Sequence, residues 1–108
     1  MQQIMKDAKV TPANPVMYSY TLNTRGTRTT SIQMVAKPLT PTGPVRAIGW
    51  LEGSNDKTTW KPIARLIASG TGTRIDGGPI ETLWEVMRFR LTTTDDCSVD
   101  VYLSQREG

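Results

Sequence analysis

The strongest constraint on the fold is an alternation of apolar and polar residues that recurs along the chain. Successive side chains of a β-strand point to opposite faces, so a period of two is typical of strands with one buried face. No segment has the 3.6-residue period of an amphipathic helix. The sequence therefore predicts an all-β fold. The alternation is clear in residues 16–22, 31–37, 45–52, 83–91 and 99–104.

Turn-forming residues separate these segments. The strongest turn is Gly-Ser-Asn-Asp-Lys at residues 53–57, and residues 60–67 form the expected return strand of a hairpin. Pro62 marks that strand as an edge or a bulged element, because proline lacks an N–H group. Such closely spaced short strands predict a β-sandwich, a jelly roll or a small barrel. Further turns are predicted at residues 38–44, 69–73, 76–79 and 92–96.

The chain divides into an N-terminal arm and one domain. Its 108 residues are enough for a single modest core. Residues 16–108 are predicted to form the sandwich or jelly roll. Residues 1–15 are predicted to be an extended arm, because Pro12 and Pro15 interrupt helices and remove ladder donors. Apolar side chains suit this arm to docking on a neighbouring molecule, with a disordered terminus as the alternative. They are Ile4, Met5 and Val10.

The residues for common enzyme chemistry are missing. The chain has no histidine, so the commonest general base and metal ligand is absent. Cys97 lies close in sequence to several aspartates, and negative charges raise the pKa of a thiol. An intrachain disulfide is excluded because Cys97 is the single cysteine. A pair of carboxylates could still catalyse glycoside hydrolysis, but such an enzyme needs a deep cleft, for which a chain of this size has little room. We therefore expect a binding protein, with no enzymatic activity, cofactor or metal.

Net charge and hydropathy limit the classes of partner that we expect for this chain. The formal net charge is +3 and the basic residues are scattered, whereas nucleic-acid binders have a denser basic stripe. No apolar run approaches the ~20 residues needed to span a bilayer, and no signal peptide is visible. We expect neither a nucleic-acid nor a membrane partner, and synthesis in the cytoplasm.

Tryptophan and arginine mark a candidate contact surface. Trp84 has the same parity as Arg88 and Arg90, whereas Met87 and Phe89 take the opposite face. If the latter face is the core, Trp84 lies beside two arginines on the outside, which is the composition of interaction hot spots. The alternative is that Trp84 folds over the edge of the sandwich. The predicted partner-binding residues are Trp84, Arg88 and Arg90, together with Ile4, Met5 and Val10 of the arm.

Two stretches resemble known families. Leu-Glu-Gly-Ser-Asn-Asp at residues 51–56, followed by Trp60, resembles a hairpin of small β-sandwich proteins in tailed-phage virions and of discoidin-like carbohydrate modules. Residues 87–92 and 99–105 resemble the closing strands of phage head or tail proteins. The resemblance covers roughly residues 45–105. Discoidin-type modules are longer and usually secreted, which favours the phage family.

The resemblance implies a structural protein of a bacteriophage virion, assembled in the host cytoplasm. The first expectation is a capsid cement or decoration protein that clamps neighbouring subunits of the major capsid protein. It would self-associate as a dimer or trimer and bind no small-molecule ligand. The alternatives are a tail or neck accessory protein, and a carbohydrate-binding module that uses Trp50 and Trp84 as a stacking platform.

Overall fold

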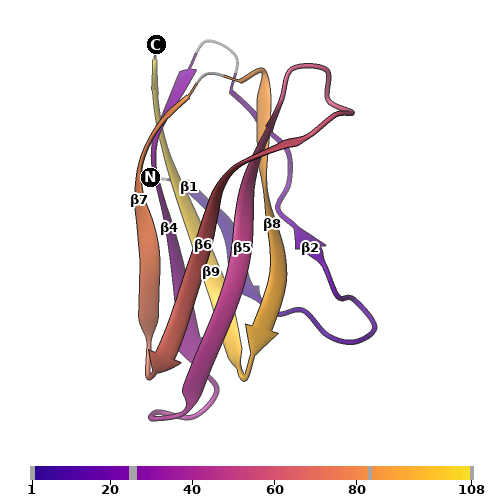
Figure 1. The fold of residues 1–108 in the computed structure, drawn as a ribbon. Helices are drawn as coiled ribbons and strands as arrows, with labels where there is room; N and C mark the ends of the chain where they lie inside the picture. Colours follow the sequence, from indigo (N-terminus) through magenta and orange to yellow (C-terminus); the bar gives the residue numbers. More distant parts are fainter. Residues whose placement is uncertain (1, 25–26, 83, 108) are drawn as a thin grey trace.

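A computed structural model describes residues 2–24, 27–82 and 84–107, which fold into two antiparallel sheets without a helix (Figure 1). The strands are β1 (Gln2–Ala8), β2 (Met17–Tyr18), β3 (Leu22–Asn23), β4 (Thr27–Pro38), β5 (Pro44–Ser54), β6 (Lys61–Thr71), β7 (Arg74–Thr82), β8 (Val86–Asp95) and β9 (Cys97–Glu107). Sheet A has the order β1-β9-β4-β7. Sheet B has the order β2-β8-β5-β6, with β3 also paired to β8.

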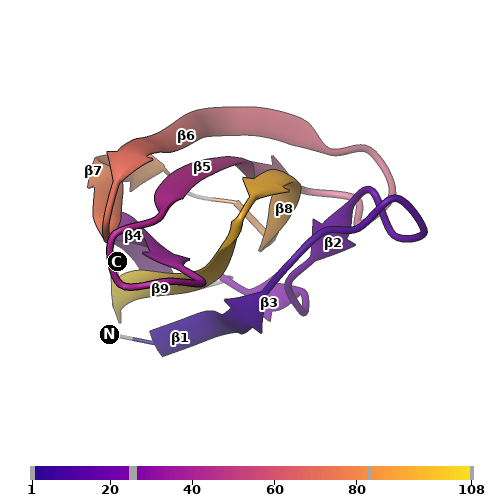
Figure 2. The same ribbon diagram turned by 90° about the horizontal axis from the view of Figure 1, so that it is seen from below.

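The strand order is that of a jelly roll. Strands pair symmetrically about the β5–β6 hairpin: β4 with β7, β2 with β8, and β1 with β9. The chain is thus one long hairpin wrapped around itself, and the β4–β9 and β5–β8 pairs complete the two sheets. The end-on view shows the two layers facing each other (Figure 2). The predicted all-β sandwich is confirmed, in its jelly-roll form.

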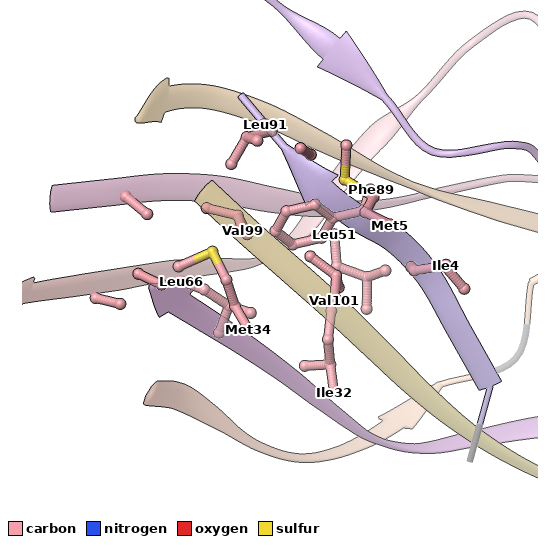
Figure 3. Close-up of a cluster of buried hydrophobic side chains, with 14 of the residues drawn as sticks. Ile4, Met5, Ile32, Met34, Leu51, Leu66, Phe89, Leu91, Val99 and Val101 are labelled. Atoms are coloured by element: carbon pink, nitrogen blue, oxygen red, sulfur yellow. The ribbon is translucent and has the colours of Figure 1, made fainter. Parts of the chain in front are cut away.

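The core lies between the two sheets, where the alternating residues of β4 and β9 meet those of β5 and β8 (Figure 3). Ile32 is paired with Leu103 and Met34 with Val101, so these side chains point to the same inner face. The inner faces predicted for residues 31–37 and 99–104 are confirmed. Phe89 on β8 is fully buried and fills the centre of this layer.

Gly49 on β5 makes room for Phe89. A Cβ atom at Gly49 would come within 2.2 Å of Cζ of the Phe89 ring. The ring thus lies directly against the β5 backbone, which only glycine permits.

The arm prediction is wrong for residues 2–8. These residues form β1, which pairs with β9 and completes sheet A. The side chains of Ile4 and Met5 are 4% and 7% exposed and belong to the core. The sequence predicted that these apolar side chains form a docking surface. They pack inside the sandwich instead. Val10 lies beyond β1; its N–H donates to Oγ1 of Thr94 at 2.9 Å and its side chain packs partly against the core.

The half-buried strand predicted at residues 16–22 is instead two two-residue strands, β2 and β3. Tyr18 and Tyr20, expected on its buried face, are 50% and 52% exposed. Tyr18 is paired with Arg90 and, like it, points away from the core, whereas Ser19 is buried. Oγ of Ser19 accepts the N–H of Phe89 at 2.8 Å, and the N–H of Ser19 donates to the Phe89 carbonyl at 2.8 Å.

Two predicted turns are also wrong. Residues 76–79 lie inside β7, and β8 continues to Asp95, so that only Asp96 remains as the turn residue, with φ +53°. β7 tolerates the Gly-Gly-Pro sequence because it is an edge strand that pairs only with β4. A Cβ at Gly77 would come within 2.2 Å of the Ile32 carbonyl oxygen, so this glycine permits a close pairing with β4.

Asp76 joins the open edges of the two sheets. It is paired with Met34 and so faces the interior of the sandwich. Its Oδ2 accepts the backbone N–H of Ile67 on β6 at 2.8 Å, and its Oδ1 accepts the N–H of Gly77. The carboxylate therefore satisfies a backbone donor at the outer edge of sheet B.

The predicted hairpin turn after residue 53 is confirmed, and side chains close it. Oγ of Ser54 accepts the N–H of Lys57 at 2.9 Å. Oδ1 of Asp56 accepts the N–H groups of Thr59 and Thr58 at 2.7 and 2.9 Å and the hydroxyl of Ser54 at 2.9 Å. These hydrogen bonds lower the pKa of the Asp56 carboxyl below its ordinary value of 3.8.

An Asp56→Asn variant is expected to lose acid sensitivity as well as stability. A lowered folded-state pKa means that the charged carboxylate stabilises the fold above its ordinary pKa, and that this contribution disappears as the pH falls through the lowered value. The difference in melting temperature between wild type and variant is therefore largest near pH 6 and shrinks towards about pH 2. Thermal unfolding followed by circular dichroism at several pH values measures it; a difference independent of pH would contradict the assignment.

Candidate docking face

The outer surface of sheet B gathers aromatic and arginine side chains from four strands. The register places Tyr18 beside Arg90, Arg90 beside Trp50, and Trp50 beside Arg65. Residues directly opposite each other in a sheet share a face, so these four form one row across it. We call this surface the aromatic–arginine face. It comprises Tyr18, Arg46, Ile48, Trp50, Glu52, Trp60, Arg65, Ile67, Arg88 and Arg90.

Arg88 is held by stacking and by an ion pair. Its guanidinium carbon lies 4.2 Å from the ring centroid of Tyr18 and 4.1 Å from that of Trp60. Its Nε donates to Oε1 of Glu52 at 3.0 Å. A planar guanidinium on an aromatic ring combines cation–π attraction with stacking. One side chain thus joins β2, β5 and the loop before β6 on the same surface.

Glu52 is the buried centre of the charge network. Its side chain is 6% exposed and lies between two arginines, with Oε2 3.4 Å from Nε of Arg90. This second contact is an ion pair without a hydrogen bond, and Nε of Arg90 has no hydrogen-bond partner among the described residues. The guanidinium carbons of Arg90 and Arg65 lie 5.6 and 5.7 Å from the ring centroid of Trp50.

Replacing Arg88 by lysine is expected to lower the free energy of unfolding by about 1–2 kcal/mol, although the charge is kept. An ammonium group cannot stack on Tyr18 and Trp60 while donating to Glu52. Arg65→Lys is the matched control. Because Arg65 is exposed, this substitution should lower the free energy of unfolding by less than about 0.5 kcal/mol. Urea unfolding of the three proteins measures the difference, and equal costs at the two positions would contradict the contacts of Arg88.

The structure separates the residues predicted to form the contact surface. Arg88 and Arg90 lie on the aromatic–arginine face, 23% and 29% exposed. Ile4 and Met5 lie in the core, and Val10 lies beside Thr94.

Trp84 is also away from this face. Its ring packs where a Cβ of Gly53 would come within 2.5 Å, and Gly53 has the inward parity of Leu51. The indole Nε1 is buried and has no hydrogen-bond partner among the described residues. The prediction that Trp84 lies beside the two arginines is therefore wrong, and it packs against the core instead. Trp50 and Trp84 lie on opposite sides of sheet B, so they cannot form a shared carbohydrate-stacking platform.

No sequence pattern predicted a contact role for most residues of the face, among them Tyr18, Glu52, Trp60 and Arg65. The parity of Trp50 and Arg65 within their strands was visible, but their proximity depends on the β5–β6 register. That register shifts between Leu51 and Glu52, opposite Pro62, which confirms the edge or bulged position predicted for this proline.

The polar cluster on sheet A is structural. Nζ of Lys37 lies 2.5 Å from Oδ1 of Asp7 and 2.8 Å from Oδ2 of Asp100, and Oδ1 of Asp100 accepts the N–H of Asp7 at 2.8 Å. These contacts raise the pKa of Lys37 and lower that of Asp7. The three groups satisfy one another and link β1, β9 and β4. Each of these three charged side chains is therefore paired within the cluster.

Other chemistry finds little support among the described residues. The thiol of Cys97 is fully buried, its Sγ donates to the Arg46 carbonyl at 3.6 Å, and burial raises its pKa, as do Asp95 and Asp96. No cluster of His, Cys, Asp or Glu in the described part of the chain could hold a metal ion. The same residues include no helix long and apolar enough to cross a membrane.

The fold and its outer surface define a jelly-roll domain with an aromatic–arginine face. In the comparisons with known proteins, no family model, no curated protein and no solved structure matches the chain.

Proposed function

We propose that this chain is a structural protein of a bacteriophage virion, of the cement or decoration kind, that docks on the major capsid protein through its aromatic–arginine face. The observation that carries the proposal is the rigid, half-exposed cluster of Tyr18, Trp50, Trp60 and arginines on one sheet surface. Tryptophan, tyrosine and arginine are the residues most enriched in binding hot spots.

The rigidity of the face supports a binding role. Long side chains normally lose rotamer entropy when they enter an interface, which costs ~0.5–1.5 kcal/mol each. Arg88 is already fixed by two rings and by Glu52. Its position is therefore defined before any partner arrives, and docking loses less entropy than on an ordinary arginine-rich surface.

The virion assignment is supported by fold and resemblance together. Jelly rolls are frequent among viral coat proteins, which is an analogy at the level of fold. The hairpin between β5 and β6 carries the sequence that resembles virion proteins, and it supplies Glu52 and Trp60 to the face. Several copies joined as a dimer or trimer would bind a shell far more firmly than one, because each further contact becomes intramolecular.

Co-sedimentation with shells tests the proposal. Wild-type protein should pellet with shells assembled from the major capsid protein alone and raise their melting temperature. Trp50→Ala should weaken binding by about tenfold or more. Tyr102→Ala is the matched control: Tyr102 is a half-buried aromatic residue paired with Gln33 on sheet A, away from the face, and its loss should leave the affinity unchanged.

Failure of wild-type protein to bind shells or to stabilise them would refute the cement role. Binding lost equally in Trp50→Ala and Tyr102→Ala would refute the assignment of the face. Electron microscopy of gold-labelled virions separates the alternative, because a tail or neck accessory protein would be labelled at the tail and not over the shell.

A further inference from the structure

We infer that the aromatic–arginine face recognises carboxylates, so that its partner is an acidic segment of another protein. This inference rests on the proposed role of the face as a docking surface and adds the chemistry of what docks there. Three observations carry it: the charge of the face, the contacts that hold its guanidinium groups, and the arginines that already lie over its aromatic rings.

The face carries an excess of positive charge. Among the described residues it has four guanidinium groups, the buried carboxylate of Glu52 and, at its margin, the carboxylate of Asp95, which is paired with Arg46. On sheet A, by contrast, the cation of Lys37 is matched by two carboxylates. A partner surface with excess negative charge is therefore complementary to the outside of sheet B and not to that of sheet A. The four guanidinium groups belong to Arg46, Arg65, Arg88 and Arg90.

The guanidinium groups are positioned for carboxylates. The guanidinium carbons of Arg65 and Arg90 lie within cation–π range of the Trp50 ring, at 5.7 and 5.6 Å from its centroid. A fixed planar fork matches the two oxygens of a carboxylate, which a flexible ammonium group does not. The face already holds one carboxylate between two arginines, because the two oxygens of Glu52 lie 3.0 and 3.4 Å from Nε of Arg88 and Arg90. Arg65 is exposed and has no ion-pair partner among the described residues.

The aromatic rings argue against nucleic acid and sugar as partners. Bases and sugars bind such surfaces by stacking on free ring faces. Here the guanidinium of Arg88 lies over both Tyr18 and Trp60, and those of Arg65 and Arg90 approach Trp50. A base or a sugar would have to displace these groups in order to stack. An acidic protein segment needs no free ring face.

Binding of a fluorescein-labelled poly-glutamate peptide to the full chain tests the inference by fluorescence anisotropy. We expect saturable binding that weakens steeply with salt, because exposed charges are screened. Arg65→Gln should weaken it by about fivefold, and Arg65→Gln with Arg46→Gln by more. Lys6→Gln is the charge-matched control: Lys6 is exposed on β1 of sheet A, and its loss should change the affinity by less than about twofold. Circular dichroism checks that each variant is folded.

Two results would overturn the inference. If labelled oligothymidylate binds more tightly than poly-glutamate with the same dependence on Arg65, the face recognises phosphate. If poly-glutamate does not bind, or binds equally well to Arg65→Gln and Lys6→Gln, the carboxylate chemistry is wrong. Shell binding that persists in Arg65→Gln but is lost in Trp50→Ala would refute the carboxylate chemistry alone, whereas absence of shell binding by wild-type protein would refute the proposed function.

Discussion

A Glu52→Ala variant is expected to lose about 2–4 kcal/mol of unfolding free energy, because it removes the only carboxylate between two half-buried arginines. Arg88 and Arg90 would then be left with like charges close together and without the ion-pair partner that they share. The cost lies below that of a fully buried pair, since both guanidinium groups retain some contact with water.

Chemical denaturation at neutral pH measures this loss. Asp95→Asn is the control, because Asp95 makes an exposed ion pair with Arg46 at 3.8 Å and such pairs contribute less than about 1 kcal/mol. Equal losses in the two variants would mean that burial of Glu52 has no energetic consequence. We also expect Glu52→Ala to weaken docking on shells, because Arg88 loses the partner that fixes its position over Tyr18 and Trp60.

A Phe89→Ala variant is expected to lose about 3–5 kcal/mol, the usual cost of removing a fully buried aromatic ring. The ring contacts the backbone of β5 at Gly49, so its loss opens a cavity between the sheets that neighbouring strands cannot collapse to fill. For a domain of this size, such a loss is a large share of the total stability.

Gly49 and Phe89 should be strongly coupled. Gly49→Ala alone places a methyl group 2.2 Å from the ring and should cost about 1–3 kcal/mol. In the Phe89→Ala background the ring is gone and the remaining close atom is the Arg90 carbonyl oxygen at 3.3 Å, so the same methyl group should cost much less. A double-mutant cycle measures the coupling. Gly78→Ala, where a Cβ meets nothing within 4 Å, should be near neutral; additivity of the Gly49 and Phe89 changes would refute the packing.

Strand identity could be predicted from the sequence where one face is buried. The buried parity of Ile32 and Met34 on β4, and of Val99 and Val101 on β9, follows from alternation alone, because water is excluded from only one side of each strand. The turn after β5 was equally predictable, since Ser54 and Asp56 close it by local hydrogen bonds.

Long-range pairing could not be predicted in this way. Ile4 and Met5 have the same apolar character whether they cover β9 or a neighbouring molecule, and only the space beside β9 decides between the two. Likewise, Tyr18 points outward because it is paired with Arg90, which is distant in sequence. The aromatic–arginine face depends on three strand pairings of this kind, so the sequence revealed two of its arginines but not the rings that hold them.

The contact of Asp76 with β6 limits how copies of the molecule can join. An uncovered edge strand invites a second chain to continue the sheet, and repetition of that step produces filaments. Here the carboxylate occupies the amide of Ile67, so a strand arriving at that point would meet a negative charge and find its donor already taken. A protein of this shape is therefore protected at this point of β6 against edge-to-edge growth when many copies are crowded together.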